Sequence, residues 1–141
     1  MILEKENKNL LSIKESTDSK LNISFIKTID DKDFGIPNTT HDIFQDKIKL
    51  TKILKTILSI KEKTVDSLIN SRKNSEAGTE KINIDKFNWC NHKIKNYLLE
   101  CGTSKKYFVV RAGDSRILGY IENNIFYLIC IEYTLNTIYK H

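Results

Sequence analysis

The last third of the chain alternates apolar runs with short polar breaks. The runs YFVVR, RILGYI and IFYLICI are rich in aromatic and β-branched residues. They are separated first by Ala-Gly-Asp-Ser and then by Asn123-Asn124, where asparagine tolerates the positive φ of a two-residue type I′ turn. This pattern predicts three antiparallel strands joined by two tight turns. The third run, residues 125–131, is apolar on both faces, so we expect it to be covered on both sides.

Helical spacing marks three segments before these strands. Residues 42–60 predict the longest helix, with five apolar positions on one face: Leu50, Ile53, Leu54, Ile57 and Leu58. Residues 64–73 predict a short second helix, and residues 89–102 predict a third. Residues 79–87 alternate and predict a short strand or extended segment between the last two helices.

The predicted fold class is α+β, with two to three helices packed on a small antiparallel β-meander. Residues 41–141 are expected to form this domain. Residues 1–40 are polar with scattered apolar positions, and we interpret them as an N-terminal arm or a partly ordered extension. Within them, residues 21–29 are compatible with one strand that has three apolar residues on a shared face: Ile23, Phe25 and Ile29.

The charge of the chain favours an acidic partner. The formal net charge is +5 and the pI is about 9.0. Residues 41–73 contain eight Lys or Arg and four Asp or Glu, so +4 of the net +5 lies there. We therefore consider four lysines as nucleic-acid contacts: Lys49, Lys52, Lys105 and Lys106. The alternative is that the lysines of the long helix only solvate its outer face.

Several classes of protein do not fit the sequence. No apolar run approaches the ~18 residues of a membrane span, and the charged start MILEKENKNLL does not fit a signal peptide. We expect a cytoplasmic protein without a membrane partner. No Walker loop, G-x-G-x-x-G, H-E-x-x-H or G-x-S-x-G motif occurs. The histidines His41, His92 and His141 lack metal-ligand spacing, so we predict neither a metal nor a cofactor.

The candidate catalytic residues are two arginines, a tyrosine and a histidine: Arg111, Arg116, Tyr139 and His141. Arg111 and Arg116 flank the first turn and should lie nearly opposite one another. Two adjacent guanidinium groups repel unless an anion lies between them. Asp114, Glu132 or a bound phosphate are the anions that we consider. The alternative is that both arginines are solvated residues beside a turn, paired locally with Asp114.

These residue types suit the cleavage of RNA through its 2′-hydroxyl. That reaction needs a base for the 2′ proton, a cation for the phosphorane and an acid for the 5′ leaving oxygen. The arginines suit the cationic role. His141 suits the base or the acid near neutral pH, and Tyr139 suits the acid or stacking on a nucleobase.

The order of helices, basic antiparallel meander and terminal aromatic and basic residues resembles the RelE/ParE superfamily of bacterial toxins. The resemblance is carried by residues 107–111, 116–121, 124–131 and 138–139, and it extends over roughly residues 44–141. It implies that Arg111 and Arg116 contact phosphate and that Tyr139 or His141 is the terminal aromatic or acid. RelE-like members cleave mRNA, often on the ribosome, whereas ParE-like members inhibit gyrase. An antitoxin neutralises both by covering the active face. The segment is also similar to uncharacterised bacterial and phage-borne proteins.

The leading hypothesis is a toxin-like, metal-independent endoribonuclease that cleaves mRNA through the 2′-hydroxyl. Its expected partners are RNA, including ribosome-bound mRNA, and a cognate antitoxin or other protein. One alternative is a non-enzymatic binding protein of a toxin–antitoxin, immunity or phage-defence system. Another is a nucleic-acid-binding module that uses the long helix. A nuclease predicts that Arg111, Arg116 and either Tyr139 or His141 converge within about one phosphate's reach in a concave site, whereas a binding protein predicts dispersed arginines and a flat apolar patch.

Overall fold

A five-stranded sheet forms the centre of the molecule. The computed structural model describes residues 19–71 and 78–141. Within them the strands are β1 (Asn22–Ser24), β2 (Thr79–Ile82), β3 (Tyr107–Ala112), β4 (Ser115–Glu122) and β5 (Ile125–Glu132). They lie in the order β1-β5-β4-β3-β2, and every pair is antiparallel except β1 with β5, which is parallel.

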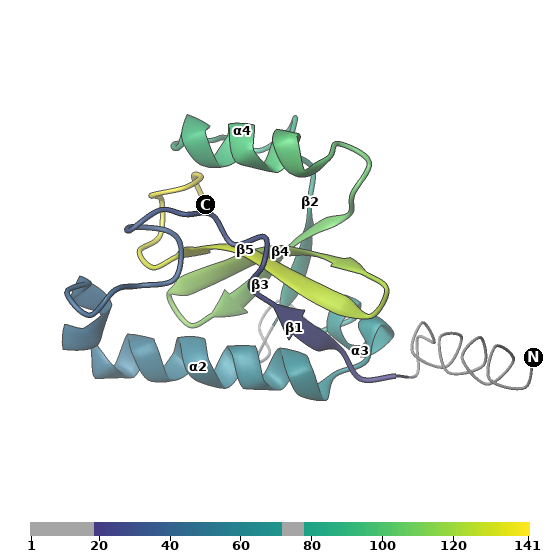
Figure 1. Ribbon diagram of the computed structural model, residues 1–141, viewed down its shortest axis with the longest axis horizontal. Helices are drawn as coiled ribbons and strands as arrows, with labels where there is room; N and C mark the ends of the chain where they lie inside the picture. The colour runs from purple at the N-terminus through teal and green to yellow at the C-terminus, as the bar shows by residue number, and fades with distance from the viewer. Residues whose placement is uncertain (1–18, 72–77) are drawn as a thin grey trace, which may run out of the picture.

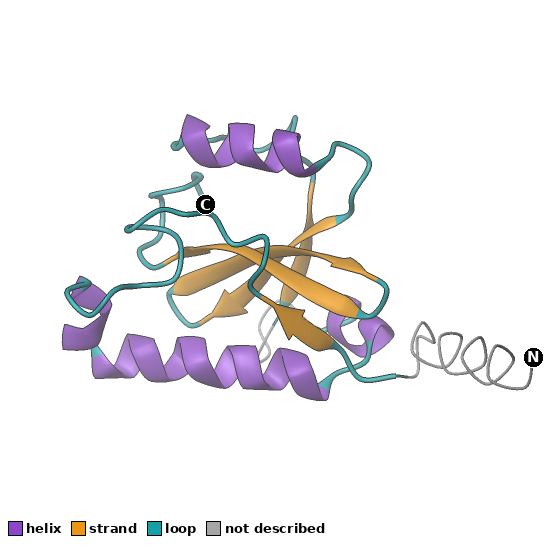
Figure 2. Cartoon of the chain, in the orientation of Figure 1, coloured by secondary structure: helices purple, strands orange, loops and turns teal. Residues whose placement is uncertain are grey.

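Helices cover both sides of the sheet. The long helix α2 (Lys47–Glu62) follows a 3₁₀ turn, η1 (Asp42–Gln45), and precedes the short helix α3 (Val65–Ile69). In Figure 1, α2 crosses one side of the sheet and α4 (His92–Cys101) crosses the other, an arrangement that Figure 2 repeats by element type. This arrangement confirms the predicted α+β class. In the part of the chain that is described, no helix is both long and apolar enough to cross a membrane.

The meander forms as its sequence predicts. Asn123 and Asn124 have φ values of 52° and 59°, and Glu122 pairs with Ile125 on either side of this two-residue turn. In the β3–β4 turn, Gly113 has a φ of 61°, which a residue with a Cβ rarely adopts. Strand β5 is covered on both sides, because its side chains contribute to both hydrophobic clusters of the core.

The described part of the predicted arm belongs to the sheet and the core. Leu21 is buried in the cluster on the α2 side, and Ile29 is buried in the cluster on the α4 side. The predicted shared face of residues 21–29 is therefore wrong, and Phe25 is 47% exposed. The reason is that β1 ends at Ser24, so the alternation of a strand does not reach residue 29. The core continues across residue 40, while residues 1–18 lie outside the described residues.

The buried face of α2 is rotated from the predicted one. The helix buries Ile53, Thr56 and Ile60 against the sheet, whereas Leu54 and Leu58 are 55% and 54% exposed. The apolar positions spread over more of the helix circumference than the sheet covers. Thr56 is accommodated inside because its hydroxyl donates to the Lys52 carbonyl oxygen at 2.8 Å. The helix also begins five residues later than predicted, since Asp46 caps it by accepting from the backbone N–H of Lys49.

An ion pair connects α4 to the loop after β1. Lys93 Nζ donates to Asp31 Oδ2 at 2.8 Å, and Asp31 Oδ1 accepts from the backbone N–H groups of Asp33 and Phe34. Burial alone would raise the pKa of the Asp31 carboxyl, but the hydrogen bonds from Lys93 and from these two N–H groups outweigh it and lower the pKa. Because the pKa is lower in the folded state, the ionised carboxyl stabilises the folded protein at pH values above its usual pKa of ~3.9. This contribution is lost as the pH falls through the folded-state pKa.

Replacing Asp31 with Asn is therefore expected to reduce stability at pH 7 by a few tenths to about 1 kcal/mol, the range of partly exposed ion pairs. The difference between Asp31→Asn and wild type should shrink as the pH falls below ~3.9, because the wild-type carboxyl then also loses its charge. Urea unfolding followed by Trp89 fluorescence at pH 7 and at the lowest pH where the protein remains folded would measure both effects. Equal stabilities at pH 7 would contradict the prediction.

Candidate functional site

A cleft opens at the end of the sheet beside the β3–β4 turn. Its volume is about 440 Å³, and it lies on the side of the sheet that faces α4. Strands β2, β3 and β4, the loop before α4 and the C-terminal segment all contribute to its walls. The lining residues are Gly78, Glu80, Lys86, Phe87, Asn88, Val109, Arg111, Arg116, Tyr139, Lys140 and His141.

The two arginines lie opposite one another on adjacent strands. Arg111 pairs with Arg116 in the register of β3 and β4, which confirms the prediction made from the turn. Arg116 Nη1 donates to the carbonyl oxygens of Gly113 and Ser115, each at 2.8 Å, and these two bonds fix its guanidinium beside the turn. Over residues 19–71 and 78–141, the acidic residue that lines the cleft with them is Glu80 of β2. Asp114 does not line it.

Tyr139 reaches the cleft because the chain folds back after β5. The carbonyl oxygen of Ile138 accepts from the backbone N–H groups of Cys90 and Asn91, and the N–H of Lys140 donates to the Asn88 carbonyl oxygen at 2.9 Å. The Tyr139 ring lies 4.5 Å from the ring of Phe87 between centroids.

The Tyr139 hydroxyl is held in its protonated form. Burial raises its pKa, and the nearby charge of Glu132 raises it further, while a side-chain hydrogen bond with Arg116 partly opposes the shift. Tyr139 therefore remains a hydrogen-bond donor well above neutral pH, and it is unsuited to act as a base there.

A buried carboxylate lies behind the cleft. Glu132, the last residue of β5, pairs with Arg116 across the strands and is fully buried. Its Oε2 accepts from the backbone N–H groups of Ile138 at 2.8 Å and Tyr139 at 3.2 Å. Its Oε1 lies 2.5 Å from Nε2 of His141. Glu132 therefore contacts the segment that carries two of the predicted residues, and it does not itself line the cleft.

The structure brings together four of the eight predicted site residues. Arg111, Arg116, Tyr139 and His141 line the one cleft. The four lysines lie elsewhere. Lys105 and Lys106 precede β3 at its opposite end, where Lys105 pairs with Glu122 at 2.7 Å.

The other two lysines belong to α2, on the opposite side of the sheet. The stem of Lys52 packs over Gly113 of the β3–β4 turn, so close that a Cβ on that glycine would lie 2.5 Å from Lys52 Cδ. Lys49 belongs to the first turn of α2, and neither lysine lines the cleft.

Three further residues of the cleft carry chemistry that the sequence did not reveal: Lys86, Phe87 and Lys140. Lys86 and Phe87 join the site because residues 88–91 pair with residues 138–140, through the Trp89–Tyr139 bridge and the backbone hydrogen bonds around it. Nothing local in the sequence indicates that pairing. Among the described residues, the cleft thus carries four Lys or Arg side chains and one acidic residue, together with aromatic rings. A site of this charge attracts anions, and the rings offer surfaces for stacking a nucleobase.

Metal ligands are not grouped in this part of the chain. Over residues 19–71 and 78–141, no three His, Cys, Asp or Glu side chains gather as a metal site would need.

Comparison with known proteins gives no match, whether with family models, curated proteins or solved structures.

Proposed function

We propose that the protein is a metal-independent endoribonuclease that cleaves RNA through the 2′-hydroxyl of the substrate. The observation that carries the proposal is the convergence of Arg111, Arg116, Tyr139 and His141 on one cleft, from two strands and the C-terminal segment. A binding protein with dispersed arginines does not require such a site.

The arginines are proposed to bind the scissile phosphate and to stabilise the phosphorane. Arg111 and Arg116 lie side by side in the strand register, so both guanidinium groups can approach one phosphate group. The hydrogen bonds from Arg116 to the carbonyl oxygens of Gly113 and Ser115 fix its position before substrate binds. Such preorganised positive charge acts most strongly where negative charge develops in the transition state.

His141 and Tyr139 are proposed to move the protons. His141 takes the 2′ proton through Nδ1, because its Nε2 is already engaged by Glu132. Tyr139 donates its phenolic proton to the 5′ leaving oxygen. Its raised pKa keeps that proton in place until an alkoxide, which is a stronger base, forms beside it.

We further propose a toxin-like role of the RelE/ParE kind, with mRNA as substrate and a protein antitoxin as partner. The support is the meander with paired arginines and the return of an aromatic and a basic residue to its open end. An antitoxin would act by covering the cleft.

The purified full-length chain is expected to cleave a single-stranded oligoribonucleotide in the presence of EDTA and to leave a 2′,3′-cyclic phosphate. The corresponding all-2′-deoxy oligonucleotide should not be cleaved, because the nucleophile is missing. A gel assay with mass spectrometry of the products measures both results.

Single-site 2′-deoxy substitution supplies the matched control, since it blocks cleavage only at the modified position. Cleavage of the all-deoxy substrate, or activity abolished by EDTA, would contradict the mechanism. Intact RNA in every reaction, including those with added ribosomes, would favour the binding-protein alternative.

A further inference from the structure

Glu132 is a carboxylate with no access to solvent. Its exposed fraction is 0%, and it is the last residue of β5. A buried carboxylate is costly unless several hydrogen bonds satisfy it. Glu132 meets that requirement through three groups that all belong to residues 138–141.

The three contacts do two different things. The two backbone N–H groups, from Ile138 and Tyr139, donate to Oε2 and hold the C-terminal segment against the end of β5, together with its backbone hydrogen bonds to residues 88–91. The third contact involves the imidazole of His141, whose Nε2 meets Oε1. An ionised carboxylate only accepts hydrogen bonds, so the neutral imidazole must carry its hydrogen on Nε2. Nδ1 is then the unprotonated nitrogen.

We propose that Glu132 is a positioning residue that docks the C-terminal segment and fixes the tautomer of His141, so that Nδ1 is the nitrogen that accepts a proton. This inference rests on the proposed nuclease function for its catalytic consequence, but the tautomer itself does not depend on activity. Glu132 does not touch the substrate, because it is fully buried and is absent from the lining of the cleft. It acts through His141 and Tyr139, in the way that a buried carboxylate orients a catalytic histidine.

The decisive variant is Glu132→Gln, which keeps the size of the side chain. The single amide oxygen can still accept from the two backbone N–H groups, which leaves the amide NH₂ to face His141. An NH₂ group donates, so Nε2 of His141 must become the acceptor and the hydrogen must move to Nδ1. The expected result is a reversal of the His141 tautomer with the segment still docked.

Nitrogen-15 NMR of the imidazole rings of the full chain at a pH where they are neutral would read the tautomers directly, with His141 assigned from a His141→Gln sample. His41 is an internal reference, because its Nδ1 accepts from the backbone N–H of Ile43 at 3.0 Å and so should carry its hydrogen on Nε2 in every sample. For wild type we expect His141 with hydrogen on Nε2 only. A mixture of tautomers in wild type, or the same tautomer in Glu132→Gln, would overturn the proposal.

Kinetics separate this inference from the proposed function. In Glu132→Gln, kcat should fall at least ~10-fold while KM stays within about two-fold, since the arginines that bind phosphate are unchanged. If wild type cleaves no RNA, the nuclease function fails and the NMR result still decides whether Glu132 fixes His141. If Glu132→Gln reverses the tautomer but keeps full kcat, the catalytic consequence is wrong. If the variant does not fold, the wild-type tautomer alone remains a test.

Discussion

Replacing Arg111 and Arg116 together with alanine is expected to abolish RNA cleavage while the protein stays folded. Removing a single preorganised donor from a charge-stabilising site commonly costs ~10²-fold or more in kcat, and this variant removes both guanidinium groups that face the proposed phosphate. Both side chains are partly exposed at the end of their strands, so little core packing is lost. Cleavage of an oligoribonucleotide, with circular dichroism to verify the fold, measures the effect.

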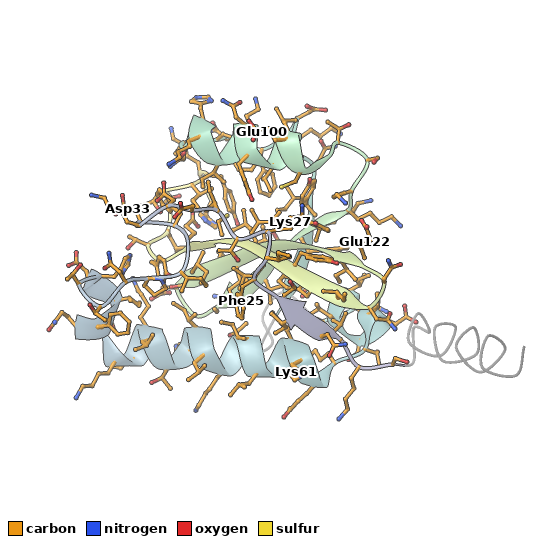
Figure 3. The ribbon with its side chains drawn as sticks, viewed as in Figure 1. Phe25, Lys27, Asp33, Lys61, Glu100 and Glu122 are labelled. Carbon is orange, nitrogen blue, oxygen red and sulfur yellow. The ribbon has the colours of Figure 1, made fainter. Side chains whose placement is uncertain are left out.

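The matched control is Lys47→Ala with Lys61→Ala. It also removes two positive charges, but from α2 instead of from the cleft. Both lysines are exposed, and Lys61 lies on the outer side of the helix (Figure 3). This variant should retain cleavage. In a bacterial host, induced wild type should arrest growth and create new 5′ ends in total RNA, whereas the arginine variant should do neither. Equal losses of RNA cleavage in the two variants would mean that the general attraction of RNA to positive charge, rather than the cleft, explains the activity.

Leu98→Ala is expected to destabilise the protein by about 2–5 kcal/mol, the usual cost of emptying a buried leucine site. Leu98 has an exposed fraction of 0% and packs from α4 against the side of the sheet that holds the cleft. Its removal leaves a cavity beneath the helix. Chemical denaturation of the full chain, with the slope compared between variants, measures the change.

The neighbouring residue provides the control. Leu99 belongs to the same helix but is 37% exposed, so Leu99→Ala changes helix propensity equally without opening a buried cavity. Its effect should stay below about 1 kcal/mol. Similar losses for both variants would show that α4 does not cover the sheet as described.

Features that depend on neighbouring residues could be predicted from the sequence. The Asn-Asn turn and the Gly113 turn define the registers of two hairpins, and the register brings Arg111 opposite Arg116. The same reasoning placed an apolar strand inside the sheet, because β5 is hydrophobic on both faces. The turn residues and the two-residue alternation of side chains along a strand are sufficient to predict each of these features.

Features that depend on distant residues could not be predicted. The pairing of β1 with β5 joins segments about a hundred residues apart and leaves no local pattern. The docking of residues 138–141 depends on Glu132 and on the carbonyl oxygen of Asn88. No sequence pattern identifies either group as a partner of this segment. For the same reason Lys86 and Phe87 were not recognised as neighbours of Tyr139. The rotated face of α2 is a different case, since its apolar residues allow more than one buried face.

Contacts between the C-terminal and N-terminal parts of the chain have a consequence for protein synthesis. Thr28 donates to the carbonyl oxygen of Leu128, 100 positions further along the chain, so this contact forms only after that stretch has been translated. At ~5–20 residues per second the N-terminal strand waits ~5–20 s for its neighbour. Tyr139 and His141 emerge later still. The cleft therefore lacks two of its candidate residues until residue 141 has been translated, and a nuclease assembled in this order could not act before that point.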